Sequence, residues 1–128
     1  MLNASRHVLL LLRDNDKEIP FPNCWDLPGG HVEVDETPRE CIQREMREEL
    51  EMELDHPRLF RTYDFADRRE FVFWRCADFD ITTVPLHEGQ RLRWFSEDDI
   101  GRPTDEQVAY NFRLVLLDFY REQPWLHV

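Results

Sequence analysis

Residues 30–52 read GHVEVDETPRECIQREMREELEM, and this stretch decides how the rest of the chain is interpreted. Its middle, residues 37–40 (TPRE), is a strong helix start. Threonine caps a helix, proline suits the first helical position, and a glutamate three residues after the cap completes a capping box. Ile42, Met46 and Leu50 then recur every four residues. This spacing predicts a helix from about Thr37 to Leu50 with one apolar stripe.

Short strands are predicted on both sides of this helix. Residues 5–13 carry an apolar run typical of a strand buried on both faces, and residues 31–34 fit another short strand. Residues 57–65 and 69–78 are rich in aromatic and branched side chains and predict a β-hairpin, and residues 91–95 predict a further strand. A second long helix is expected to start at residues 103–104. Its apolar face would consist of Val108, Phe112, Val115, Leu116 and Phe119. The mixture predicts one α/β domain over residues 1–128.

The composition excludes several classes of protein. Of the 128 residues, 41% are hydrophobic and 12% aromatic, which argues against disorder. The net charge of −11 disfavours binding to a nucleic acid polymer. The run Val8–Leu12 is too short for a membrane span, and the three cysteines contain no C-x-x-C pair. We therefore expect a cytoplasmic protein without a membrane partner. A homodimer is compatible with the sequence.

Three carboxylates share one face of the predicted helix. Glu45 lies within three and four residues of Glu48 and Glu49, so like charges repel one another there. A bound divalent cation would reverse the sign of that interaction. Oxygen ligands favour Mg²⁺, Mn²⁺ or Ca²⁺ over zinc. Gly29 and Gly30, which precede the helix, lack a Cβ and let the backbone approach a metal or a phosphate.

Taken alone, residues 44–49 (REMREE) would most often be a solvated helix face with salt bridges. The wider spacing favours a site: Gly30, then Glu36, the pair Arg44-Glu45 and the pair Glu48-Glu49. Six fixed positions at roughly 7% usage each match by chance on the order of once in 10⁵ sequences. A functional motif is therefore the better interpretation.

The segment resembles the signature of the Nudix hydrolases, G-x5-E-x7-R-E-U-x-E-E-x-G-U, in which U is apolar. All its fixed positions match except one, where Glu51 stands in place of glycine. That glycine ends the helix, so the departure concerns local geometry more than catalysis. The preceding residues 25–30 (WDLPGG) also look like the family's approach to the motif. The resemblance implies an α/β/α sandwich with a mixed central sheet, a catalytic helix and a C-terminal helix.

The resemblance also implies roles for individual residues. The expected metal ligands are the Gly29 carbonyl, Glu45, Glu48, Glu49 and Glu88. Arg44, Glu48 and Glu88 are the expected catalytic residues, while Gly30 and Glu36 would support the site, with Glu36 paired to Arg44. Glu88 enters because residues 87–90 (HEGQ) are similar to a turn in MutT-like members, where the glutamate is a further ligand or the general base. An exposed loop glutamate is the competing interpretation.

The expected activity is Mg²⁺-dependent hydrolysis, with Mn²⁺ as a second possible cation, of a diphosphate linkage in a small nucleotide-type substrate. A nucleoside triphosphate, including oxidised forms, is the first choice, and ADP-ribose or a nucleotide sugar is the second. Two competing hypotheses are a non-catalytic Nudix-fold nucleotide-binding module and an unrelated α/β protein with an acidic helix. No substrate-binding residue can be assigned. The aromatic candidates for stacking on a base or packing in the core are Trp25, Tyr63, Phe65 and Phe73.

Overall fold

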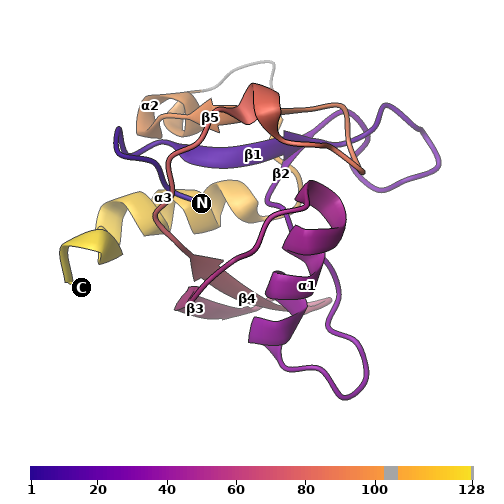
Figure 1. Cartoon of the computed structure of the whole chain (residues 1–128), viewed down its shortest axis with the longest axis horizontal. Helices are drawn as coiled ribbons and strands as arrows, with labels where there is room; N and C mark the ends of the chain where they lie inside the picture. The colour runs from indigo at the N-terminus through magenta and orange to yellow at the C-terminus, as the bar shows by residue number, and fades with distance from the viewer. Residues whose placement is uncertain (103–106, 128) are drawn as a thin grey trace.

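The structure, a computed structural model, describes residues 1–102 and 107–127 (Figure 1). Its strands and helices follow one another along the chain as β1 (Val8–Leu12), β2 (Trp25–Asp26), α1 (Pro38–Leu50), β3 (Arg58–Asp64), β4 (Arg69–Trp74), β5 (Arg91–Phe95), α2 (Glu97–Gly101) and α3 (Phe112–Glu122). Two short 3₁₀ helices lie at Ile81–Thr83 and Pro124–His127.

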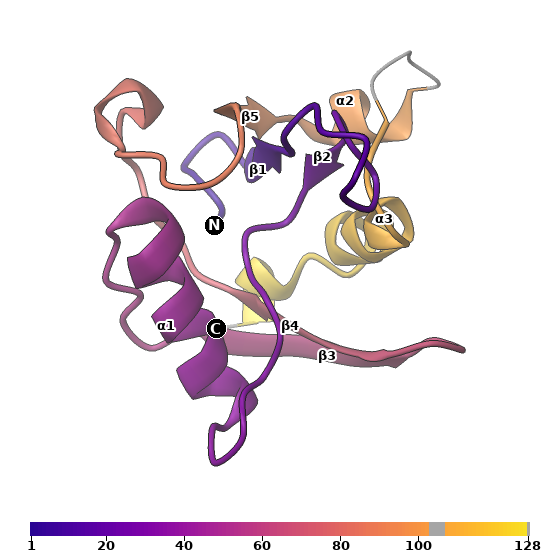
Figure 2. The ribbon, with the colours of Figure 1, turned by 90° about the vertical axis from the view of Figure 1, so that its right-hand side faces the viewer.

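The strands form a three-stranded sheet and a separate hairpin. The sheet has the order β2-β1-β5 with antiparallel neighbours, and β3 pairs with β4. Single parallel bridges join Trp25 to Val108 and Leu2 to Cys76, which gives the strand pairing its mixed character. The hairpin lies across the molecule from the sheet, with the helices between and beside them (Figure 2).

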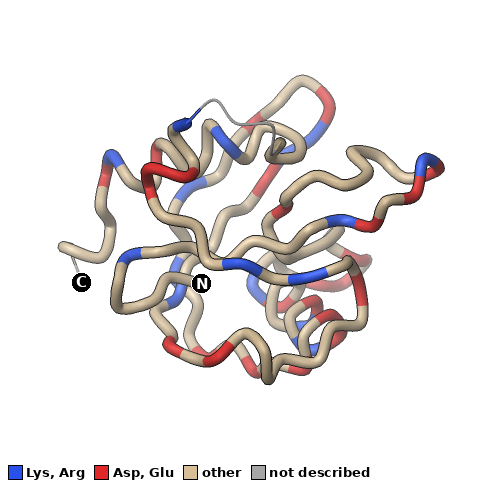
Figure 3. Tube along the Cα trace, turned by 90° about the horizontal axis from the view of Figure 1, so that it is seen from above, with Lys and Arg blue, Asp and Glu red and all other residues tan. Residues whose placement is uncertain are grey.

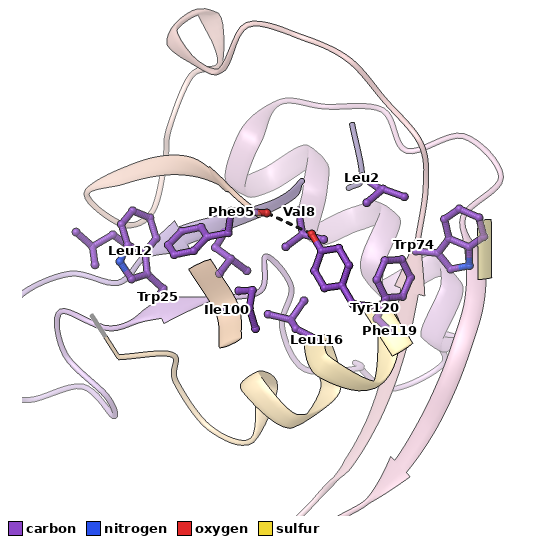
Figure 4. Close-up of a cluster of buried hydrophobic side chains, with 11 residues drawn as sticks. Leu2, Val8, Leu12, Trp25, Trp74, Phe95, Ile100, Leu116, Phe119 and Tyr120 are labelled. Atoms are coloured by element: carbon purple, nitrogen blue, oxygen red, sulfur yellow. Dashed lines mark hydrogen bonds between the residues drawn. The ribbon is translucent and has the colours of Figure 1, made fainter. Parts of the chain in front are cut away.

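Strand β1 is the centre of the molecule because all five of its residues are buried. Alternate side chains point to opposite faces of a strand. Leu9 belongs to a buried cluster with Met46 and Leu50 of α1. Val8 and Leu10 belong to a second cluster, which includes residues of α3 (Figure 4). Helix α1 therefore covers one face and α3 the other, so the chain is an α/β/α sandwich.

Helix α1 begins with the capping box that its sequence predicts and ends at a residue in the left-handed conformation. The Thr37 hydroxyl accepts a hydrogen bond from the Glu40 amide, and the Glu40 carboxylate accepts one from the Thr37 amide. At the other end, Glu51 adopts the left-handed conformation with φ 50°. The Met52 amide then donates back to the Met46 carbonyl at 3.2 Å, which closes the last turn.

The elements differ from expectation in three places. The predicted strand at residues 31–34 is wrong, because Val32 and Val34 lie on an exposed loop without a partner strand in the described residues. The short helix α2 was not anticipated. The expected start of the last helix at residues 103–104 lies outside the described residues, and α3 itself begins only at Phe112. Val108 instead bridges to Trp25, alongside β2.

The three cysteines are all free thiols, with Cys24 and Cys41 buried and Cys76 exposed. Among the described residues, no helix has the length and apolar character that crossing a membrane requires.

Candidate active site on helix α1

Arg44 is the centre of an ion-pair network on α1. Its Nε donates to Glu36 Oε2 at 2.7 Å and its Nη2 to Glu36 Oε1 at 3.1 Å, so the arginine fork holds both carboxylate oxygens. Its Nη1 donates to Glu45 Oε1 at 2.8 Å and to Glu48 Oε2 at 3.1 Å. The guanidinium lowers the pKa of Glu36 to about 2. Arg44 also donates to the His31 carbonyl, which ties the preceding loop to the helix.

Gly30 lies directly against Glu45. A Cβ at this position would lie 2.3 Å from Glu45 Oε1, so close that the carboxylate would have to move aside. Gly29 has a φ of 153°, which residues with a Cβ rarely adopt. The glycine pair therefore brings the backbone to within contact distance of a helix carboxylate.

Glu49 is the buried carboxylate of the site. It is 5% exposed, and its Oε2 atom is buried without a hydrogen-bond partner. Burial raises the pKa of Glu49 to about 9, and the adjacent carboxylates of Glu45 and Glu88 contribute to this rise. By contrast, the side chain of Glu48 is 60% exposed and contacts Arg44. The helix therefore directs these glutamates into different surroundings.

The turn at residues 87–90 brings Glu88 to the end of α1. The His87 amide donates to the Glu49 carbonyl at 3.0 Å, and the Gln90 amide donates to the Leu12 carbonyl at 2.8 Å. Gly89 is required between them, because its φ is 82° and a Cβ would lie 2.7 Å from the Leu12 oxygen. Glu88 is thus placed beside Glu49, 39 residues earlier in the sequence, by backbone contacts to α1 and β1.

These residues suit a hard divalent cation. A buried carboxylate with an unpartnered oxygen and two carboxylate neighbours is costly unless a positive charge offsets it. Arg44 supplies such a charge to Glu45 and Glu48, but no cationic side chain pairs with Glu49 in the described part of the chain. In these same residues, no three His, Cys, Asp or Glu side chains are already arranged around one metal position. The Arg44 ion pairs explain this arrangement, because they draw two of the carboxylates toward the guanidinium.

A second polar group, which the sequence did not reveal, lies between β2 and the hairpin. Arg13 pairs with Asp26 at 2.9 Å, and both Arg13 and Arg68 lie over the Tyr110 ring. Arg68 pairs in turn with Glu70 at 2.6 Å. The negative charge of Glu70 is one of the causes that raise the pKa of Asp26. Asp26 Oδ1 and Arg68 Nη2 are buried without partners. These five residues come from four separate segments, so no local motif could have indicated them.

The aromatic candidates fall into two groups. Trp25 is 2% exposed and belongs to the core. The other three are half-buried on the hairpin, where Phe65 stacks on Tyr63 with ring centroids 5.7 Å apart. Of these, only Phe65 contacts the second polar group in the described residues, through Arg68.

Comparisons with known proteins agree with this architecture. The family model described as the NUDIX domain matches residues 1–115. The ADP-ribose pyrophosphatase of Methanocaldococcus jannaschii is 35% identical over 94% of this chain and 70% of its own length. The CTP pyrophosphohydrolase of Escherichia coli is 29% identical over 70% of this chain and 68% of its own. The chain spans about two thirds of the length of the curated relatives it matches.

A solved structure of the MutT protein from Methanosarcina mazei superposes with a TM-score of 0.69 at 26% identity, over 95% of this chain and 88% of that one. The chain carries this fold, and the family model covers most of it, including α1 and the turn that holds Glu88. It is therefore a MutT-like member of the Nudix family.

Proposed function

We propose that this protein hydrolyses a diphosphate linkage in a nucleotide-type substrate with the help of a divalent cation, Mg²⁺ first and Mn²⁺ second. The observation that carries the proposal is Glu49, a buried carboxylate with an unpartnered oxygen between Glu45 and Glu88. Ionising a carboxyl group in that position is costly unless a cation binds to it. Such a group is therefore best explained by a ligand-binding role.

The ligands would be Glu45, Glu48, Glu49, Glu88 and the carbonyl of Gly29. When bound, the cation supplies charge neutralisation for the phosphate oxygens and lowers the pKa of a coordinated water. Arg44 fixes the orientation of Glu45, and Glu36 fixes Arg44 in turn. Glu48 and Glu88 are both exposed and not buried among apolar groups, so either can accept a proton from an attacking water.

A nucleoside triphosphate is our first choice of substrate, and ADP-ribose or a nucleotide sugar is the second. Relatives named for CTP and for ADP-ribose support both choices. We propose that the nucleoside binds beside Asp26 and Arg68, whose polar side chains would suit the polar edge of a base or a ribose hydroxyl. A long nucleic acid polymer is disfavoured by the net charge of −11. Acidic and basic residues are interspersed along the described chain (Figure 3).

The test is the release of phosphate or pyrophosphate across a panel of nucleotides with Mg²⁺, read by product identity. The panel contains nucleoside triphosphates, 8-oxo-dGTP, ADP-ribose, nucleotide sugars and a short 5′-triphosphorylated RNA. Glu48→Gln and Glu49→Gln should each lower turnover by orders of magnitude while the fold is retained. If no substrate in the panel releases phosphate or pyrophosphate, a non-catalytic binding module is favoured. Near-wild-type turnover in both variants would contradict the assignment of Glu48 and Glu49 as metal ligands.

A further inference from the structure

We propose that Glu51 and His87 form a positioning pair, which holds the turn carrying Glu88 against the end of α1. The inference rests on the proposed function, because it concerns the orientation of a residue assigned to the cation and the water. It assigns a role to the one position at which this chain departs from the Nudix signature.

Glu51 occupies a backbone conformation that glycine would adopt more readily. Its φ of 50° and ψ of 40° lie in the left-handed region, where a Cβ crowds the neighbouring carbonyl. The helix could end equally well with glycine, since the capping contacts here come from backbone amides. What glycine lacks is a carboxylate, so a reason for a glutamate should be sought in what its side chain contacts.

The side chain of Glu51 contacts His87. Glu51 Oε2 lies 2.6 Å from His87 Nε2, across 36 residues of sequence. The backbone of His87 is also fixed, because its amide donates to the Glu49 carbonyl at 3.0 Å. His87 is thus held at two points by the last turn of α1, and the next residue is Glu88. The end of α1 therefore carries Glu49 and also holds the turn that contains Glu88.

The pair acts where the turn has few other restraints. Glu88 is exposed and forms no ion pair within the described residues, so no cationic side chain helps to fix its orientation, which depends on the backbone of the turn. The far end of the turn is held by Gln90, whose amide donates to Leu12 and whose side chain donates to Arg13 and Asn23. The near end depends on His87. Loss of the Glu51 contact would leave one backbone hydrogen bond there.

The test replaces Glu51 with the residue that suits its backbone. Glu51→Gly should keep or raise the midpoint of thermal unfolding while kcat falls roughly threefold to fivefold, the size expected for loss of one exposed pair. KM should stay unchanged, and Mn²⁺ affinity, measured by electron paramagnetic resonance, should weaken by a similar factor. Glu51→Gln retains an acceptor for His87 and should restore kcat to near wild type. His87→Ala should match Glu51→Gly, and the double variant should be no worse than either single one.

Glu53→Gln is the matched control, because Glu53 forms an exposed pair with Arg47 at 3.6 Å near the same end of the helix, and no hydrogen bond or ion pair among the described residues joins it to the turn. It should leave kcat and Mn²⁺ affinity unchanged. Wild-type kcat and Mn²⁺ affinity in Glu51→Gly would overturn the inference, and so would a double variant whose losses multiply. If the wild-type protein turns over no substrate, the proposed function fails, while the Mn²⁺ measurements still decide whether the pair positions Glu88.

Discussion

Gly30 lies so close to Glu45 that one methyl group would displace the carboxylate. The Cβ of Gly30→Ala would lie 2.3 Å from Glu45 Oε1, so the side chain must move. Since misplacement by about 1 Å can cost a hundredfold in rate, we expect turnover to fall roughly tenfold to a hundredfold. The midpoint of thermal unfolding should change little, because Gly30 is exposed. Steady-state kinetics and thermal unfolding measure the two effects.

The control for this substitution is the same chemical change elsewhere. Gly101 ends α2, and a Cβ there would meet no atom within 4 Å. Gly101→Ala should keep full turnover and stabilise the fold by up to about 1 kcal/mol, because alanine is the better helix former. Equal turnover in the Gly30 and Gly101 variants would contradict a close approach of Gly30 to the reacting groups.

Some properties of these residues could be predicted from the sequence and others could not. Fixed spacing placed Arg44, Glu45 and Glu49 on one helix, because helical geometry depends only on separation along the chain. It could not say that Glu49 is buried while Glu48 is exposed, since that depends on what packs against each side. The contact between Glu51 and His87 was likewise invisible, because it joins residues 36 positions apart.

At the scale of elements, the start of α1 should contribute to stability without contributing to chemistry. Thr37→Ala removes the hydroxyl that accepts a hydrogen bond from the Glu40 amide and should lower the free energy of unfolding by about 1 kcal/mol. Turnover at saturating substrate should be unchanged, because Glu45 lies two turns farther along the helix. Thr37→Ser keeps the cap and serves as the control in urea unfolding. A large loss of turnover in a folded Thr37→Ala protein would contradict this separation.

Tyr120 joins α3 to the three-stranded sheet. Its hydroxyl donates to the Arg6 carbonyl at 2.6 Å and lies 3.3 Å from the Phe95 carbonyl. Burial raises the pKa of this hydroxyl above the ordinary value of about 10, so the folded state keeps the proton longer than the unfolded state. Its contribution to stability is therefore present below about pH 10 and is lost as the pH rises above that value.

Tyr120→Phe should lower the free energy of unfolding by about 1 to 2 kcal/mol at pH 8. The difference between wild type and variant should shrink above about pH 10, because only the wild type can ionise at this position. Urea unfolding at several pH values measures it. A difference that stays constant up to about pH 11, beyond the ordinary tyrosine pKa, would show that the hydroxyl is not protected by burial.

The elements themselves were predictable where their pattern was long. The helix α1 and the β3–β4 hairpin follow from caps and periodicity. The five-residue helix α2 is too short for a period to be seen, although Ser96 and Asp99 form a capping box there. The alternation of Val32 and Val34 imitates a strand, yet Val34 is 91% exposed and no partner strand lies beside it in the described residues. Only tertiary packing distinguishes a real short helix or strand from a loop with a similar local sequence pattern.

At the scale of the whole molecule, cation binding should be visible as stability. A ligand that binds only the folded state stabilises it by about 2.7 kcal/mol when its concentration is about one hundred times its dissociation constant. We therefore expect Mg²⁺ or Mn²⁺ to raise the midpoint of thermal unfolding and a chelator to reverse the rise. Glu49→Gln should abolish the response, whereas Glu53→Gln should retain it. An identical rise in Glu49→Gln would place the cation elsewhere.

Strand β1 has one more consequence, for the time scale on which the protein opens. Its side chains are buried on both faces and β5 pairs with it along its whole length, so its amides are shielded from water while both helix layers are in place. Hydrogen exchange at Leu9–Leu11 should then require the complete chain to unfold. The exposed loops should exchange orders of magnitude faster. The exchange rate of these few amides would serve as an internal gauge of global stability, readable by mass spectrometry without denaturant.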